Sequence, residues 1–267
     1  MNKMEKALLE LSEMDEIAAR RSPLHSLHPA AKLVTTIAYI LVTLSFDKYD
    51  LSGLVPMVLW PVVLFQISGT DVRSCFYKLR IVLPLVMAVG LFNPFFDREI
   101  LLRIGNVAVS GGVISMVTLM LKGVFCLMAS FLLMATTRID NLCAALRAMH
   151  FPSIIVNLLL LTYRYVGVMT EELAVMTDAY LLRAPGQKGI HISAWGSFLG
   201  QLLLRSMDRA QELYSSMKLR GYHQHFHYAA NDPFSIRDAL YVLCCIAVFL
   251  LLRYVGIAQL IGAFFVR

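Results

Sequence analysis

Five apolar stretches dominate the sequence, and each is long enough, or nearly so, to cross a bilayer as a helix. A spanning helix needs about 17–25 predominantly apolar residues. Only 16% of the residues are charged, against about 25% in soluble domains, so lipid is indicated as part of the solvent. We expect an all-α integral membrane protein with about five transmembrane helices, at Ala30 to Phe46, Leu51 to Ser68, Ile81 to Phe96, Gly112 to Thr136 and Ala239 to Ala263.

The basic residues predict how the chain is oriented. Cytoplasmic segments of membrane proteins are enriched in Lys and Arg. With a cytoplasmic N-terminus, the outside loops hold only three basic residues, Lys48, Arg98 and Arg103. Because the basic residues lie at the ends of apolar runs, the net charge of +6 favours lipid headgroups over nucleic acid as the partner. The N-terminal residues 1–21 are amphipathic and do not resemble a cleavable signal peptide.

Between the fourth and fifth predicted spans lies a region that is too polar for membrane throughout. Pro152 suits the first position of a helix, and apolar residues then recur every three or four positions to about Arg183. A second such helix is expected from about Ser193 to Leu219. Two long amphipathic helices must bury their apolar stripes on each other, on a membrane surface or on a partner.

Both predicted helices end in an Arg followed by a Gly. The first ends Leu182-Arg183-Ala184-Pro185-Gly186 and the second ends Leu219-Arg220-Gly221. An ordinary helix C-terminus favours the same residues, because Arg interacts with the negative end of the helix dipole and Gly allows a left-handed turn. The alternative is a pair of basic tips presented to a second protein, each Arg a forked hydrogen-bond donor.

Several further motifs accompany the two helix ends, in order along the chain. They are Ser22-Pro23-Leu24-His25 through Leu33, Thr162-Tyr163-Arg164-Tyr165 with Glu171-Glu172, Arg205-Ser206-Met207-Asp208-Arg209-Ala210 and Met217 to Tyr222. Together they resemble the T components of energy-coupling factor (ECF) transporters, and most closely their cobalt-type branch, usually called CbiQ. The resemblance covers about residues 22 to 222.

The resemblance implies a role as a bridge between other subunits. In that family the T component joins a substrate-binding membrane subunit (the S component) to two ABC-type ATPases, which dock on the ends of two coupling helices. Carried over, the ATPase-docking residues are Arg183, Ala184, Gly186, Arg220 and Gly221. The sequence departs from the family pattern where Leu182 and Leu219 replace an expected alanine, and where Ala184-Pro185 separates the first Arg from its Gly.

No catalytic constellation accompanies these motifs. The sequence has no GxxxxGK[ST] loop for binding ATP phosphates, so we expect no enzyme activity and no cofactor, with ATP bound by the partners. His223, His225 and His227 alternate in a tract that can bind a metal ion or can be a solvated loop. The resemblance assigns metal recognition to the substrate-binding subunit, so no metal site is assigned here.

Two charged residues fall inside predicted spans. Lys122 lies near the middle of the fourth span and Arg253 near the middle of the fifth. A charge at bilayer depth costs about 2.5–3.5 kcal/mol on insertion scales. Each should therefore contact protein or water, through an internal pair or a carbonyl, or Lys122 should line the face presented to the substrate subunit.

The predicted organisation has three parts. They are an amphipathic N-terminus with four spans (1–137), the coupling-helix region (138–237) and a C-terminal span (238–267). We expect a multi-pass protein of a prokaryotic cell membrane, with the N-terminus and the coupling helices in the cytoplasm, serving cobalt or nickel uptake. The alternatives are a T component shared by several vitamin-binding subunits, an intramembrane metalloenzyme and a stand-alone secondary transporter.

Overall fold

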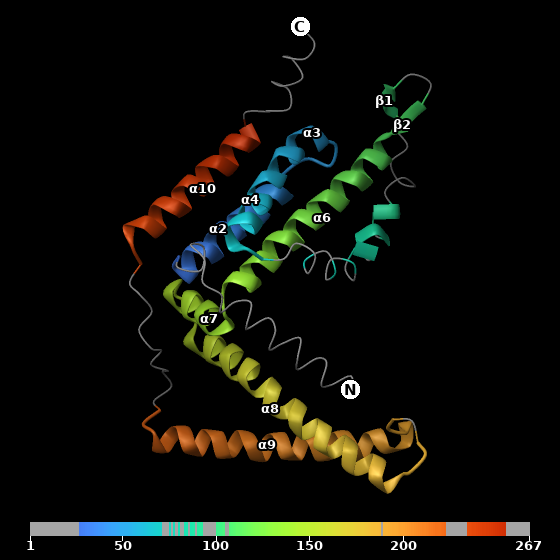
Figure 1. Cartoon of the computed structure of the whole chain (residues 1–267), viewed down its shortest axis with the longest axis vertical. Coiled ribbons are helices and arrows are strands. Elements are labelled where there is room, and N and C mark those ends of the chain that lie inside the picture. Colours follow the sequence, from blue (N-terminus) through green and yellow to red (C-terminus); the bar gives the residue numbers. More distant parts are fainter. Residues whose placement is uncertain are drawn as a thin grey trace. The chain divides into compact units, whose positions relative to one another are not determined.

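The computed structural model describes residues 27–70, 100–104, 107–187, 189–222 and 234–254, together with eleven of the positions from 75 to 92. These residues form two units. The smaller unit contains residues 139–222. The larger unit contains the described residues up to 138 and those from 234 to 254. Figure 1 shows that nearly all of the described chain is helical.

Helix α2 (Pro29–Leu44) is at the centre of the larger unit and packs against both α6 (Gly111–Thr136) and α10 (Ile236–Tyr254). Its first turn is well defined by the sequence. Pro29 occupies the first helical position, where its missing N–H costs nothing, and the His28 ring accepts a hydrogen bond from the Ala30 N–H at 3.2 Å.

The second apolar stretch forms one continuous helical segment, with a change of pitch. It consists of α3 (Leu51–Leu54), a 3₁₀ turn η1 (Val55–Val58) that contains Pro56, and α4 (Leu59–Ser68). Asp50 caps its start by accepting a hydrogen bond from the Gly53 N–H at 3.0 Å, and Gly69 ends it with a positive φ of 64°. A proline within the first turns explains the local 3₁₀ geometry.

An aromatic cluster joins α2, α4 and α10. The Tyr39 ring stacks on Trp60 with 4.5 Å between centroids, and Phe249 meets both rings edge-on at 5.4 Å. The Tyr39 hydroxyl donates to the carbonyl oxygen of Met57 at 2.9 Å. Tyr39 and Phe249 are fully buried, so the larger unit has a fixed core and is not a loose set of apolar helices.

A short β-hairpin precedes α6 and adds to the helical architecture that the sequence predicts. Strand β1 (Ile100–Ile104) pairs antiparallel with β2 (Val107–Ser110), with Ile104 opposite Val107. β-branched residues favour strands, and two such runs separated by a Gly-Asn pair are typical of a hairpin. Each strand has at most five residues, which is too short to span a membrane. From its apolar pattern alone, this segment is therefore predicted only as a loop between two spans.

The smaller unit contains α7 (Ile139–Ala148), α8 (Ser153–Arg183), a 3₁₀ turn η2 (Ile192–Ala194) and α9 (Trp195–Leu219). The bounds of α8 and α9 agree with the two predicted amphipathic helices. Val156 and Leu160 of α8 pack on Cys143 of α7 to form a small core. Most of α9 is exposed, with Phe198 its one buried residue.

The prediction of five spans is not confirmed. Among the described residues, three helices are long and apolar enough to cross a membrane: Leu51–Ser68, Gly111–Thr136 and Ser153–Arg183. The first predicted span is a helix of only 16 residues, half of the third lies outside the described residues, and the fifth is described only to Tyr254. Helix α8 qualifies because Arg164 is the one charged residue in its first 18 positions.

Candidate functional site

The end of α8 is formed by two successive turns. The Ala184 N–H donates to the carbonyl of Tyr180 at 3.1 Å, which closes the last helical turn. The Gln187 N–H then donates to the carbonyl of Ala184 at 3.3 Å, and Gly186 between them has φ +94°. Pro followed by a glycine with positive φ is the pattern of a type II β-turn. Helix α8 therefore stops directly after Arg183.

The end of α9 has a different backbone. Arg220 caps the helix and Gly221 follows with φ +80°. The Gly221 N–H donates to the carbonyl of Lys218, and the Tyr222 N–H donates to the carbonyl of Met217, both at 3.0 Å. These two bonds define a Schellman motif, in which glycine takes the left-handed position. The two ends look alike in sequence but differ in conformation, because Ala184-Pro185 moves the first glycine out of the helix cap and into a separate turn.

The predicted docking residues are accessible at both ends. Arg183, Gly186, Arg220 and Gly221 are exposed, and Ala184 is half-buried. The residue before each Arg is also exposed, by 84% at Leu182 and by 90% at Leu219. In the sequence these two leucines stand out only as departures from the family pattern. Their position directly before each Arg was the one signal that could have pointed to them. Their exposure could not be predicted, because it depends on how the helix ends pack.

Polar contacts between α8 and the chain after it connect the two helices. The Tyr180 hydroxyl donates to Gln187 Oε1 at 3.0 Å and accepts from the His191 N–H at 3.4 Å. Farther along, Arg205 of α9 forms an ion pair with Glu172 of α8. The Asn157 side-chain amide lies 3.5 Å from the Tyr222 hydroxyl. Helix α8 thus touches the chain that follows it at three points: at the loop after Arg183, at the Glu172–Arg205 ion pair, and at Tyr222 just beyond α9.

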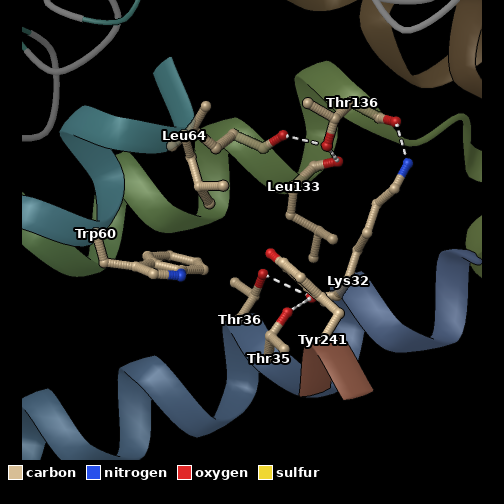
Figure 2. Close-up of a pocket in the computed structure, with 9 residues that line it drawn as sticks. Lys32, Thr35, Thr36, Trp60, Leu64, Leu133, Thr136 and Tyr241 are labelled. Atoms are coloured by element: carbon tan, nitrogen blue, oxygen red, sulfur yellow. Dashed lines mark hydrogen bonds between the residues drawn. The ribbon is translucent and has the colours of Figure 1, made fainter. Parts of the chain in front are cut away.

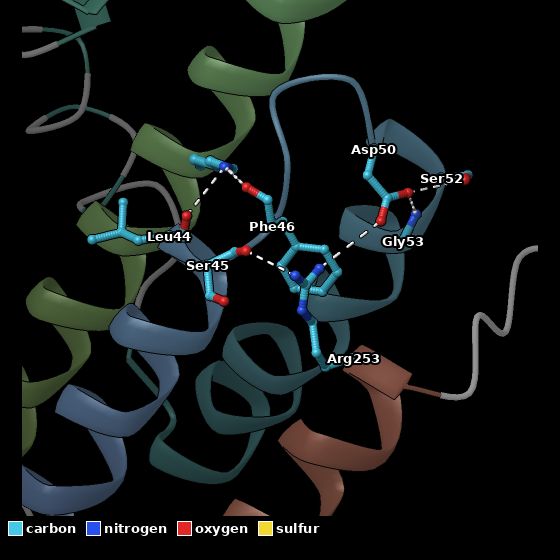
Figure 3. A network of polar contacts seen from close by, with 8 residues as sticks. Leu44, Ser45, Phe46, Asp50, Ser52, Gly53 and Arg253 are labelled. Carbon is cyan, nitrogen blue, oxygen red and sulfur yellow. Dashed lines mark hydrogen bonds and ion pairs between the residues drawn. The ribbon is translucent and has the colours of Figure 1, made fainter.

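The two charged residues predicted inside spans, Lys122 and Arg253, meet at the C-terminal end of α2. Lys122 of α6 donates to the carbonyls of Leu44, at 3.3 Å, and Phe46. Figure 3 shows the Arg253 guanidinium between the Ser45 carbonyl, 2.8 Å away, and Asp50, 4.0 Å away. These cations satisfy carbonyls that a helix end leaves without partners. Carbonyl contact, one of the accounts expected for both residues from the sequence, is therefore what the structure shows.

A second polar cluster lies at the other end of α2, and sequence reasoning did not find it. Lys32 is only 5% exposed, and its ammonium donates to the carbonyl of Thr136 at the end of α6, 3.0 Å away. The His28 N–H donates to Asp238 of α10, also at 3.0 Å. The sequence did offer one signal, the charge of Lys32 near the start of the first apolar stretch. A basic residue is ordinarily expected there, at the cytoplasmic end of a span, so the charge did not indicate a buried contact.

Together the two clusters connect α2 to the same two neighbours at both ends. At its N-terminal end α2 and its capping residue donate hydrogen bonds, to α6 through Lys32 and to α10 through His28. At its C-terminal end it accepts them, from α6 through Lys122 and from α10 through Arg253. The free carbonyls at a helix end need such partners, and these partners also fix the three helices in register.

A small cavity lies beside Lys32. Figure 2 shows the Lys32, Thr35, Thr36, Thr136 and Tyr241 side chains around it. Its volume is about 10 Å³, close to the space that a single water molecule needs. The Thr35 and Thr36 hydroxyls both donate to the Lys32 carbonyl, at 3.0 and 2.8 Å. The cavity can therefore hold a single water molecule.

Metal chemistry has no support among the described residues, where no group of three or more His, Cys, Asp or Glu residues could hold a metal ion. The predicted histidine tract, His223, His225 and His227, lies outside the described residues. The candidate functional features are therefore the two helix ends and the polar clusters around α2.

Comparisons with known proteins agree with the motifs. The nickel permease LarQ of Lactiplantibacillus plantarum is 28% identical over 116 residues, 43% of this chain and 42% of the relative. The cobalt transport protein CbiQ of Rhodobacter capsulatus is 30% identical over 104 residues, 38% of this chain and 42% of the relative. The chain thus spans less than half the length of each of these two relatives. An uncharacterized protein of Methanocaldococcus jannaschii is 20% identical over 202 residues, 72% of this chain and 69% of the relative.

The family model described as CbiQ, cobalt transport protein, matches residues 20–228. This range contains the ends of α8 and α9 and the first four predicted spans, including Lys32 and Lys122. It covers most of the chain, whereas each of the cobalt and nickel relatives covers a shorter part. The chain therefore belongs to the CbiQ family of cobalt transport proteins.

Proposed function

We propose that this chain is the T component of an ECF-type importer, coupling ATP hydrolysis by two partner ATPases to a substrate-binding membrane subunit. The observation that carries the proposal is the pair of long helices, each of which ends in an exposed arginine, Arg183 or Arg220. A guanidinium offers five donors in a planar fork that suits carboxylates and carbonyls. Membership of the CbiQ family supports the same assignment.

The proposed cargo is cobalt or nickel. One relative is called a nickel permease and another a cobalt transport protein, and both ions are divalent first-row transition metals with similar ligand preferences. The runner-up is a T component shared by several vitamin-binding subunits. Co-purification separates the two, because a dedicated T component brings down one substrate-binding subunit and a shared one brings down several.

In this mechanism the chain performs no chemistry and transmits motion. Helix α8 has 31 residues, about 46 Å at 1.5 Å per residue. A displacement of its Arg183 end by an ATPase is thus carried far along a rigid rod. The contacts of α8 with α9, including the Glu172–Arg205 ion pair, make the two helices respond together. ATP is bound by the partners, so the chain itself needs no cofactor.

The proposed location is a prokaryotic cell membrane, with α8 and α9 on the cytoplasmic side. The asymmetry of the basic residues supports this orientation. The charged second half of α8, with Glu171, Glu172 and Asp178, supports a place outside the hydrocarbon core, even though the whole helix is long enough to span it. The lipid bilayer is then a partner of the larger unit only.

The test is co-purification in mild detergent from cells that express the neighbouring transporter genes. Wild-type chain is expected to bring down two ATPase subunits and a membrane subunit, and Arg220→Glu or Arg183→Glu is expected to lose the ATPases and metal uptake. Arg209→Glu is a matched control, because Arg209 is about half-exposed on α9 but lies away from its end. Full uptake by the Arg220→Glu protein would rule the proposal out.

A further inference from the structure

The two leucines before the arginines are unusually exposed. Leu219 at 90% has the largest exposed fraction among the large apolar side chains that the structure describes, and Leu182 has 84%. A single exposed leucine on a protein surface needs no explanation. Here the same residue stands in the same place at the ends of two different helices, directly before an exposed arginine each time.

The ends of α8 and α9 differ in backbone after the arginine and are alike before it. After Arg183 the chain enters a turn through Pro185 and Gly186, whereas after Arg220 it enters a Schellman motif at Gly221. A partner that binds both ends in the same way cannot recognise the backbone beyond each arginine, because that backbone differs. The two ends share Leu-Arg, carried on the last helical turn of each helix.

Leucine and arginine offer a partner different chemistry. An exposed leucine gains free energy when its apolar surface leaves water, and this gain depends little on salt. An arginine contributes charge and directed hydrogen bonds, which steer association and weaken as salt rises. Residues that dominate binding are those that become fully desolvated in a pocket of the partner. A leucine side chain that protrudes from a helix end can enter such a pocket without any change in the helix that carries it.

We propose that Leu182 and Leu219 are apolar anchors that enter a hydrophobic pocket on each ATPase, beside the acidic or carbonyl groups that receive Arg183 and Arg220. This inference rests on the proposed function, since it concerns the same docking contact. It specifies the partner: each ATPase groove has an apolar pocket wide enough for a leucine. Because a residue as small as alanine would leave that pocket partly empty, the leucines also select ATPases with this pocket.

The experiment measures binding of the co-purified ATPases to the full chain in lipid nanodiscs, at low and at high salt. Leu182→Ala and Leu219→Ala are each expected to weaken binding about tenfold, with an unchanged salt dependence. Leu219→Met, which keeps the volume, is expected to bind nearly as wild type. Leu203→Ala is the matched control, because Leu203 is 61% exposed but lies within α9, away from its end.

The outcomes separate the two proposals. If the arginine variants lose binding while both leucine variants bind as tightly as wild type, the anchor proposal is wrong and the docking proposal stands. If Leu203→Ala weakens binding as much as Leu219→Ala, the anchor proposal is also wrong, because the effect is not confined to the ends. If Arg183→Glu and Arg220→Glu bind normally, the docking proposal itself fails. Thermal unfolding of each variant confirms that the fold is intact.

Discussion

The Arg253 guanidinium donates a hydrogen bond to the carbonyl oxygen of Ser45 at 2.8 Å, and so connects α10 to the end of α2. The same group lies 4.4 Å from the centre of the Phe46 ring. A hydrogen bond of this kind contributes about 0.5–1.5 kcal/mol net. We expect Arg253→Met to lower the free energy of unfolding by that amount and Arg253→Lys to lower it less. Thermal unfolding in detergent measures both, and a fully stable Arg253→Met protein would contradict this role.

Lys32 provides the matching test at the other end of α2. Its ammonium is buried and donates to the carbonyl of Thr136. Lys32→Met keeps the stem but removes the donor, and we expect a loss of about 1–3 kcal/mol of stability. Lys48→Met is the control, because Lys48 is exposed. Equal stability of the Lys32→Met and Lys48→Met proteins would show that the buried hydrogen bond contributes nothing.

Two glycines of the smaller unit should respond in opposite directions to the same substitution. Gly221 has φ +80°, and a side chain in the left-handed region costs about 1–2 kcal/mol. Gly167 lies within α8 and a Cβ there meets nothing within 4 Å, so alanine should gain about 0.5–1 kcal/mol. We therefore expect Gly221→Ala to destabilise and Gly167→Ala to stabilise, as measured by denaturant unfolding. The same sign for both would contradict the backbone described at the end of α9.

The Glu172–Arg205 ion pair should affect geometry more than stability. Both side chains are partly exposed, and exposed pairs contribute only about 0.2–1 kcal/mol. We expect Glu172→Arg to broaden the distance distribution between spin labels at Asp178 and Gln201, two exposed positions on α8 and α9. The exchanged pair, Glu172→Arg with Arg205→Glu, should restore it. If the distance distribution of the Glu172→Arg protein is the same as that of wild type, the ion pair does not fix α8 relative to α9.

Cys143 tests the packing of α7 on α8. Burial raises the pKa of the Cys143 thiol, and the charge of Asp140 raises it further. A raised pKa means less thiolate at neutral pH, and the thiolate is the reactive form. We expect Cys143 to react slowly with maleimide in the folded protein and rapidly after denaturation, as followed by mass spectrometry. Leu160→Ala, which opens the core beside it, should speed the reaction.

The sequence predicted α8 and α9 well, because their apolar periodicity, Pro152 and Gly221 are local signals of helix start, face and end. It did not predict the partners of Lys122 and Arg253. Their hydrogen bonds go to backbone carbonyls at the end of α2, and a carbonyl is the same in every residue. The differing ends of α8 and α9 were also not predicted, since the effect of Ala184-Pro185 depends on where the chain goes next. The docking roles of the two terminal arginines stay predictions.

The contacts at the two ends of α2 have a mechanical consequence. Sliding a helix by one residue along its axis shifts it by about 1.5 Å and turns its side chains by about 100°. Such a slip of α2 would pull Lys32 from Thr136 and, at the same moment, Ser45 from Arg253. A slide of α2 alone would therefore break the contacts at both of its ends, whereas a movement of α2 together with α6 and α10 would keep them.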